Sequence, residues 1–160
     1  MKVIVFDVDG TLTDGRIYMG NDGEEFKAFN IKDGCGIHDL MPKYNLIPVV
    51  ITARQSQIVK NRCDELGIVH CYQSCRDKNQ KLKEVAEVLG IFPDEQLVYR
   101  EIAYMGDDII DMPVMQLCGI TGCPNDAAKE IKHLADFVSN KKGGEGAARE
   151  FIEWIIENYI

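Results

Sequence analysis

The sequence is short of positive charge. It carries 18 lysines and arginines against 26 aspartates and glutamates, a net charge of −8. General nucleic-acid binding needs a basic surface, so this balance argues against it. The sequence also lacks an apolar run long enough to cross a bilayer, and the hydrophobic run at the N-terminus meets charge at Asp7, unlike a signal peptide. We therefore expect a cytoplasmic protein that binds neither nucleic acid nor membrane.

Paired cysteines are absent as well. None of the six cysteines has the Cys-x-x-Cys spacing that structural zinc sites favour, and they are scattered along a chain without a leader. Reduced thiols are the expected state, as in most intracellular α/β domains. The six are Cys35, Cys63, Cys71, Cys75, Cys118 and Cys123.

The remaining composition suits one compact domain. The chain has 160 residues, 46% of them hydrophobic, and no internal repeat, so we expect a single domain over 1–160. Strand-like and helix-like segments alternate, which predicts an α/β fold with a doubly wound parallel sheet. Expected strands are 2–6, 47–51, 69–72, 102–105, 119–121 and 137–138, expected helices 33–44, 56–66, 79–89, 112–116, 126–133 and 146–160, and a hairpin is expected over 16–29 around Asn21-Asp22-Gly23.

Two carboxylates stand at the end of the first strand. The apolar run before Asp7 is typical of a buried parallel strand, and ligands of such sheets bind beyond the carboxyl ends of the strands. Asp7 and Asp9 resist joint ionisation unless a cation lies between them or one keeps its proton. The pair therefore indicates a metal site, acid/base chemistry or both, although Asp-x-Asp also occurs in ordinary strand-end turns.

Four motifs in order carry a family resemblance. FDVDGTLTD at the N-terminus, ITAR with Thr52, DKNQ with Lys78 and MGDD with Asp107 each follow a predicted strand or open a predicted helix. Together they resemble the signature of the haloacid dehalogenase (HAD) phosphatase superfamily, which implies a Rossmann-like α/β fold. Each motif alone is weak, but four in register are a strong signal.

The resemblance implies phosphoryl transfer through an aspartyl-phosphate. Asp7 would be the nucleophile, Asp9 the general acid and base, Thr52 a ligand of the phosphoryl oxygens, and Lys78 the cation that offsets their charge. The family's Mg²⁺ ligands map to the carboxylates of Asp7 and Asp107 and to the backbone carbonyl of Asp9. Asp108 and Asp111 are open: either could reach the metal through water, orient the lysine, or cap the following helix.

Neither gap between the motifs has room for a cap domain. The chain most resembles the small capless sugar-acid phosphatases, which act on 3-deoxy-D-manno-octulosonate 8-phosphate or on nine-carbon, sialic-acid-type 9-phosphates. The segments that carry this resemblance are distributed along the whole chain. Besides the motifs above, they are FNIKDGCGI, RDKNQKL and GGEGAAREF. It implies that the hairpin at 16–29 assembles a homotetramer and that the segment 143–146 lies near a partner's site. The same unit occurs fused to sialic-acid cytidylyltransferases.

Substrate contacts are less well defined. Arg54 could bind the sugar-acid carboxylate bidentately or pair with an acidic neighbour. Lys32, Asp33 and Gly34 begin the predicted helix beside the site and could position sugar hydroxyls. The Thr-x-Arg form favours the eight-carbon substrate of lipopolysaccharide biosynthesis over the nine-carbon acids.

Two other functions compete with this interpretation. A receiver domain also combines aspartates, a Thr or Ser, a lysine and Mg²⁺, but its phosphorylated aspartate lies in mid-chain and its lysine comes late. A catalytically idle relative could serve in assembly or regulation. Against it, every expected catalytic residue is present: Asp7, Asp9, Thr52, Lys78 and Asp107.

Overall fold

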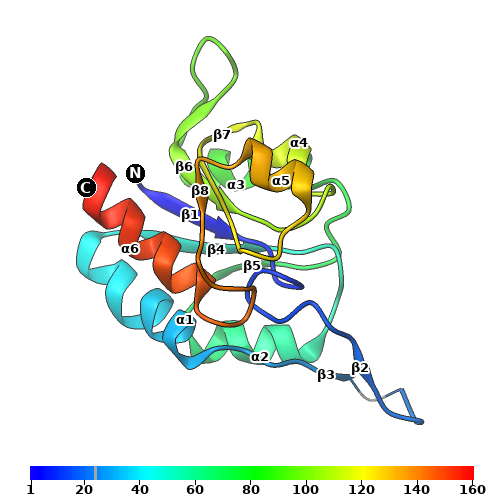
Figure 1. Cartoon of the computed structure of the whole chain (residues 1–160). Helices are drawn as coiled ribbons and strands as arrows, with labels where there is room; N and C mark the ends of the chain where they lie inside the picture. The colour runs from blue at the N-terminus through cyan, green and yellow to red at the C-terminus, as the bar shows by residue number, and fades with distance from the viewer. Residues whose placement is uncertain (24) are drawn as a thin grey trace.

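A computed structural model describes residues 1–23 and 25–160 and shows a six-stranded, fully parallel sheet. The strand order is β5-β4-β1-β6-β7-β8, with β1 in the interior of the sheet (Figure 1). The α/β class and the doubly wound parallel sheet are therefore confirmed. The strands are β1 (Val3–Phe6), β4 (Ile47–Ile51), β5 (His70–Tyr72), β6 (Tyr99–Met105), β7 (Cys118–Cys123) and β8 (Phe137–Val138).

Helices cover both faces of the sheet (Figure 1). On one face lie α1 (Ile31–Cys35), η1 (Gly36–Leu40), η2 (Met41–Tyr44), α2 (Gln57–Glu65) and α6 (Ala147–Tyr159). On the other lie α3 (Lys78–Val88), α4 (Met112–Met115) and α5 (Lys129–Leu134). The alternation of side chains along β1 explains both layers, because Ile4 and Phe6 pack in the first and Val3 and Val5 in the second.

The segment predicted as one helix over 33–44 differs from the prediction. It begins at Ile31, because the Asn30 side chain accepts a hydrogen bond from the Lys32 N–H and caps the first turn. It then passes from α to π geometry at Gly36 and to 3₁₀ geometry at Met41, where Pro42 has no N–H to continue the helical bonding. Three short helical pieces thus replace a single regular helix.

Two other elements begin three residues away from their predicted starts. β6 starts at Tyr99, so part of the long stretch before the acidic motif is strand, and the loop before it is organised by the Asp94 carboxylate, which accepts from the Gln96 and Val98 N–H groups. The helix predicted from Asp126 begins at Lys129.

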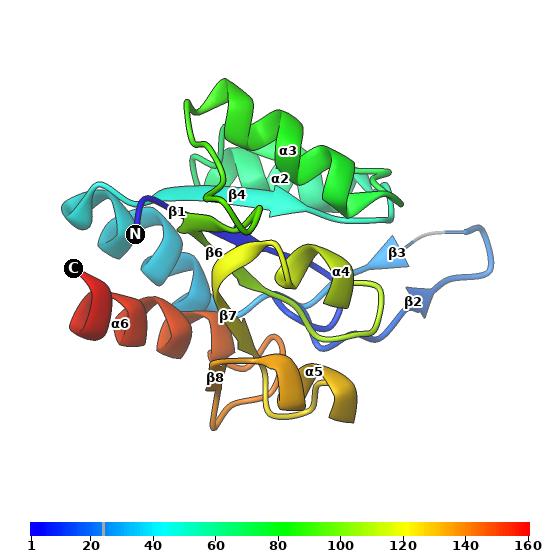
Figure 2. The same cartoon turned by 90° about the horizontal axis from the view of Figure 1, so that it is seen from above.

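The hairpin is confirmed, and it projects from the body of the molecule (Figure 2). Its strands β2 (Tyr18–Met19) and β3 (Glu25–Phe26) pair antiparallel to each other and form a separate two-stranded sheet. Thr13 and Phe29 form an isolated bridge at its base. Among the described residues, only the hairpin and α1, η1 and η2 lie between β1 and β4, and only α2 and β5 between β4 and α3, so no cap domain is inserted there.

None of the helices in the described part of the chain combines the length and the apolar character that a membrane crossing requires. All six cysteines are free.

Candidate active site

Three adjacent strands and one helix bring the predicted residues together. Asp7 follows β1, Thr52 follows β4 and Asp107 follows the end of β6, while Lys78 opens α3. These strand ends meet at one edge of the sheet because β4, β1 and β6 are neighbours and parallel. A cavity of about 260 Å³ opens there, lined by Asp7, Asp9, Gly15, Thr52, Ala53, Arg54, Asp107, Asp108 and Ile110.

Lys78 is buried between two carboxylates. Its Nζ donates to Asp7 Oδ1 at 2.7 Å and to Asp111 Oδ1 at 2.6 Å, and its side chain is 2% exposed. Burial acts to lower the pKa of Lys78, but Asp7 and Asp111 outweigh it and raise that pKa above its ordinary value. The ammonium therefore keeps its charge and holds Asp7 facing the cavity.

Asp111 orients the lysine. Its Oδ1 accepts from Lys78 and from the Tyr104 hydroxyl at 2.9 Å, and its Oδ2 accepts from the N–H groups of Asp107 and Asp108 at 3.1 and 3.4 Å. Both oxygens thus have partners within the protein, so the lysine-orienting alternative holds and this carboxylate is poorly placed to take a metal. Sequence reasoning missed Tyr104, whose pKa is raised by burial so that it remains a donor; a tyrosine within the apolar end of β6, Ile102 to Met105, was the available signal.

Asp7 and Asp107 each accept one side-chain hydrogen bond, from Lys78 at Asp7 Oδ1 and from the Thr11 hydroxyl at Asp107 Oδ1 (3.3 Å), which leaves Oδ2 of each without a side-chain donor in the described part of the chain. Burial, and then the neighbouring carboxylate of Asp111, raise the pKa of Asp7 to about 7. Burial, followed by Asp7, raises the pKa of Asp107 to about 8. Oxygens of Asp7, Asp107 and Asp111 lie within 4.8 Å of one another. Since both oxygens of Asp111 already accept from donors of the protein, the cation site falls to Asp7 and Asp107, whose mutually repelling carboxylates fit a hard divalent cation.

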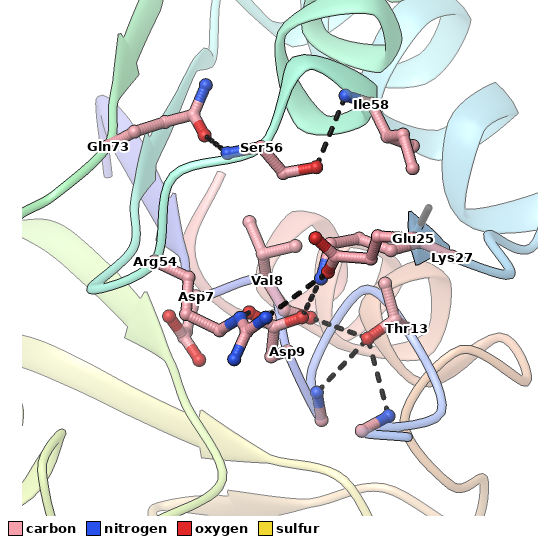
Figure 3. Close-up of polar contacts among 12 residues, drawn as sticks. Asp7, Val8, Asp9, Thr13, Glu25, Lys27, Arg54, Ser56, Ile58 and Gln73 are labelled. Carbon is pink, nitrogen blue, oxygen red and sulfur yellow. Dashed lines mark hydrogen bonds and ion pairs between the residues drawn. The ribbon is translucent and has the colours of Figure 1, made fainter. Parts of the chain in front are cut away.

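The loop after Asp7 is closed by Thr13 and by glycines. The Thr13 hydroxyl accepts from the N–H groups of Gly10 and Gly15 and donates to the Val8 carbonyl, each at 3.3 Å (Figure 3). Gly10 has φ +92°, and a Cβ there would lie 2.0 Å from Asp107 Oδ2. Only glycine therefore lets the loop approach the second metal-site carboxylate so closely.

The glycine segment 143–146 lies against this chain's own loop. A Cβ on Gly143 would lie 1.8 Å from the Gly10 carbonyl oxygen, and the Gly144 N–H donates to the Thr11 carbonyl at 3.2 Å. The segment thus supports the loop after Asp7 within one subunit, and its predicted position near a partner's site stays a prediction.

Asp9 is surrounded by charged groups that sequence reasoning did not combine. Lys27 Nζ contacts Asp9 Oδ1 and lies 2.7 Å from Glu25 Oε1. Arg54 Nε lies 3.9 Å from Asp9 Oδ2, and its Nη2 lies 3.5 Å from Glu25 Oε1. Arg54 thus lines the cavity, as expected, and it pairs with acidic neighbours. No sequence signal pairs Lys27 with Asp9: in the structure its side chain is buried, whereas the neighbouring Phe26 is 61% exposed.

Three predicted substrate contacts lie elsewhere. Lys32 is exposed, and neither it nor Asp33 and Gly34 lines the cavity. The Asp33 carboxylate is 3% exposed and accepts from the Arg149 N–H at 2.8 Å and from the Gly146 N–H at 3.3 Å. It therefore caps the start of α6, which is a structural task. Asp108 does line the cavity, and its Oδ1 accepts from the Ile109 N–H at 2.7 Å.

Curated relatives match almost the whole length of the chain. No family model matches the chain. Over 156 residues the chain is 41% identical to the 3-deoxy-D-manno-octulosonate 8-phosphate phosphatase KdsC of Salmonella typhi, covering 98% of this chain and 79% of that protein.

Solved structures of similar proteins share the fold. The 3-deoxy-D-manno-octulosonate 8-phosphate phosphatase of Moraxella catarrhalis, crystallised with a magnesium ion, a phosphate ion and a KDO molecule, matches with a TM-score of 0.90 and 34% identity over 98% of this chain and 86% of that one. A Legionella pneumophila protein described as a HAD superfamily (subfamily III A) hydrolase matches with a TM-score of 0.90 and 33% identity over 98% and 82%. The chain is thus an enzyme of the phosphatase class, and it belongs to the 3-deoxy-D-manno-octulosonate 8-phosphate phosphatase family of the HAD superfamily.

Proposed function

We propose that this chain is a Mg²⁺-dependent phosphomonoesterase that hydrolyses 3-deoxy-D-manno-octulosonate 8-phosphate through an aspartyl-phosphate. One observation carries the proposal: a buried lysine holds one oxygen of Asp7, and a carboxylate oxygen of Asp107 lies within 4.8 Å of one of Asp7 where both residues line the cavity. This arrangement supplies a fixed carboxylate nucleophile and a cation site at the same point, which is what phosphoryl transfer asks of a protein.

The reaction divides into two steps on this chain's residues. An Asp7 carboxylate oxygen attacks phosphorus, the bond to the sugar oxygen breaks, and Asp9 gives that oxygen its proton. Asp9 then takes a proton from a water molecule, which attacks the aspartyl-phosphate, releases inorganic phosphate and restores Asp7. Lys78 neutralises charge on Asp7, and Thr52 and the backbone amides after Asp7 bind phosphoryl oxygens.

Mg²⁺ fits the donor set. The carboxylates of Asp7 and Asp107 would hold it, with the Asp9 carbonyl as the third protein ligand, and the ion would supply charge neutralisation between nucleophile and phosphate. The magnesium ion of the Moraxella catarrhalis relative supports this choice.

The sugar-acid specificity rests on Arg54 and on the relatives. The Arg54 side chain is 46% exposed at the wall of the cavity and is held by long ion pairs, so its guanidinium is available to a substrate carboxylate. Four of the family's phosphatases from enterobacteria are at least 39% identical to this chain.

We further propose that residues 1–160 act as one phosphatase domain, in the cytoplasm, as a homotetramer assembled through the hairpin. The described part of the hairpin exposes a row of apolar side chains, and a two-stranded sheet of this kind is not stable alone. The exposed side chains are Ile17 (51%), Tyr18 (39%), Met19 (73%) and Phe26 (61%). Met19→Glu combined with Phe26→Glu should convert the assembly to a smaller species in light scattering, whereas Ile160→Glu at the C-terminus should not.

Phosphate release from a substrate panel tests the reaction. The panel contains 3-deoxy-D-manno-octulosonate 8-phosphate, nine-carbon sialic-acid-type 9-phosphates and hexose phosphates, each with Mg²⁺ and with a chelator. We expect release from the eight-carbon substrate with Mg²⁺ alone. A preference for a nine-carbon acid would reassign the substrate, and no release from any compound would favour the idle interpretation.

Asp7→Asn tests the nucleophile. The substitution keeps the side chain's shape and removes the attacking carboxylate, so turnover should fall below detection while the thermal midpoint stays within a few degrees. Phosphate release surviving in a folded Asp7→Asn variant would contradict the aspartyl-phosphate mechanism.

A further inference from the structure

The hairpin delivers a buried cation to Asp9. Lys27 follows β3, and its side chain is only 1% exposed although the hairpin itself projects into solvent. Its Nζ contacts the Asp9 carboxylate and the Glu25 carboxylate. Figure 3 shows Glu25, Lys27 and Arg54 converging on Asp9. The end of the hairpin's second strand thus fixes a side chain of the loop after β1.

The burial of Lys27 needs both carboxylates. A buried ammonium is costly unless it is paired, and burial acts to lower the pKa of Lys27, yet the contacts with Asp9 and Glu25 raise that pKa above its ordinary value. The Asp9 side chain is 24% exposed and faces the cavity. Lys27 therefore restrains one oxygen of Asp9 and leaves the other side of the carboxylate toward the substrate.

Arg54 cannot give the same restraint. Its contact with Asp9 is 3.9 Å long, and its side chain is 46% exposed, so it is held loosely. Lys27, in contrast, is enclosed and makes the close contact. The two cations thus have different roles. Arg54 remains free to bind substrate, whereas Lys27 is fixed on the Asp9 carboxylate.

We propose that Lys27 is a positioning residue that aims Asp9 at the leaving-group oxygen, so that the hairpin takes part in the chemistry of its own subunit. This inference rests on the proposed function, in which Asp9 protonates the departing oxygen. It gives the hairpin a task apart from assembly.

Leaving-group dependence tests the inference. The readout is kcat/KM, which reflects the steps up to and including cleavage of the ester bond and does not include the later hydrolysis of the aspartyl-phosphate. A sugar phosphate needs a proton on its departing oxygen, whereas 2,4-dinitrophenyl phosphate, whose leaving group is a stable anion, does not. Lys27→Met should lower kcat/KM about 100-fold for the sugar-acid phosphate and less than about 5-fold for the aryl phosphate, the size of a lost general-acid contribution.

Matched variants separate positioning from folding. Lys27→Arg keeps a cation and should recover most of the activity, and Lys43→Met removes an exposed lysine on η2 and should match the wild type. In an Asp9→Asn background, Lys27→Met should cause no further loss for the sugar-acid phosphate, because the group that it aims is gone. If Lys27→Met does not fold, Lys27→Gln replaces it, with the same selective loss expected.

The outcomes distinguish the two proposals. Equal losses on both substrates, or additive losses in the Asp9→Asn background, would overturn the positioning role, because the lysine would then act through stability or the nucleophile. An unchanged ratio between the kcat/KM values for the two substrates in folded Lys27→Met would also overturn the positioning role. Failure of the wild-type chain to hydrolyse any sugar-acid phosphate would instead overturn the proposed function.

Discussion

At the scale of single residues, the aspartates of this chain differ in what their oxygens are free to do. Both oxygens of Asp111 accept two hydrogen bonds within the protein, whereas Asp7 and Asp107 keep free oxygens in the cavity. Asp33 resembles Asp111, because it is buried and each of its carboxylate oxygens accepts a hydrogen bond from a backbone N–H group at the start of α6. A carboxylate whose acceptors are already used stabilises the fold or orients a neighbour, and one with free oxygens can bind a cation or attack.

We expect Asp33→Ala to reduce stability without changing substrate binding. The substitution leaves the Gly146 and Arg149 N–H groups unpaired in the interior, which costs on the order of 1–3 kcal/mol in the free energy of unfolding. Urea denaturation measures this loss, and KM for the sugar-acid phosphate should stay within about twofold. Asp33→Asn, which keeps one acceptor oxygen, should lose less. A raised KM at unchanged stability would instead return Asp33 to the substrate-contacting residues.

At the scale of elements, the sequence was sufficient wherever burial patterns dominate. The strand at 47–51 and the helices at 57–65 and 147–159 were predicted within a residue or so, because apolar periodicity, Ser56 and the glycines mark their ends. Asp7 and Asp9 followed from their place at a strand end, whereas Thr52, Lys78 and Asp107 were assigned through the resemblance to the HAD phosphatases. The sequence could not reveal Lys27 on Asp9 or Asp33 on α6, since these contacts join segments that only the tertiary fold brings together.

The contact between the glycine segment and the nucleophile loop makes a prediction at this scale. Gly143→Ala places a methyl group 1.8 Å from the Gly10 carbonyl oxygen, which is backbone and cannot rotate away, so the loop must shift. We expect at least a tenfold loss of kcat, because small misplacements of reacting groups are costly. Gly90→Ala is the control: its methyl group meets nothing within 4 Å, and its positive φ should cost only about 1–2 kcal/mol of stability. Wild-type kcat in Gly143→Ala would show that the loop tolerates the shift.

At the scale of the whole molecule, an acidic chain concentrates its cations at one end of its sheet. The net charge of −8 repels an anionic substrate, but Lys27, Arg54 and Lys78 lie at the cavity or directly behind it. Lys78 is shared between Asp7 and Asp111, so one cation faces three carboxylates when Asp107 is included, and the metal-free site keeps an excess of negative charge. The stability of the molecule should therefore depend on protons and on Mg²⁺ at the same site.

This coupling predicts how the metal-free protein responds to pH. The folded-state pKa values of Asp7 and Asp107, about 7 and about 8, lie above the ordinary aspartate value of 3.8, so the folded state binds more protons than the unfolded state between these limits. Stability from these groups is therefore complete at low pH and is lost as pH rises through about 7 to 8. With a chelator present, the free energy of unfolding in urea should fall from pH 5.5 to pH 8.5. Asp107→Asn lacks one of the two groups with a raised pKa, so it should show a shallower fall.

Excess Mg²⁺ replaces the protons, so it should stabilise the wild type more at pH 8.5 than at pH 5.5. Equal slopes in the wild type and Asp107→Asn would contradict the assignment, because Asp107 would then not contribute a proton that is bound more tightly in the folded state.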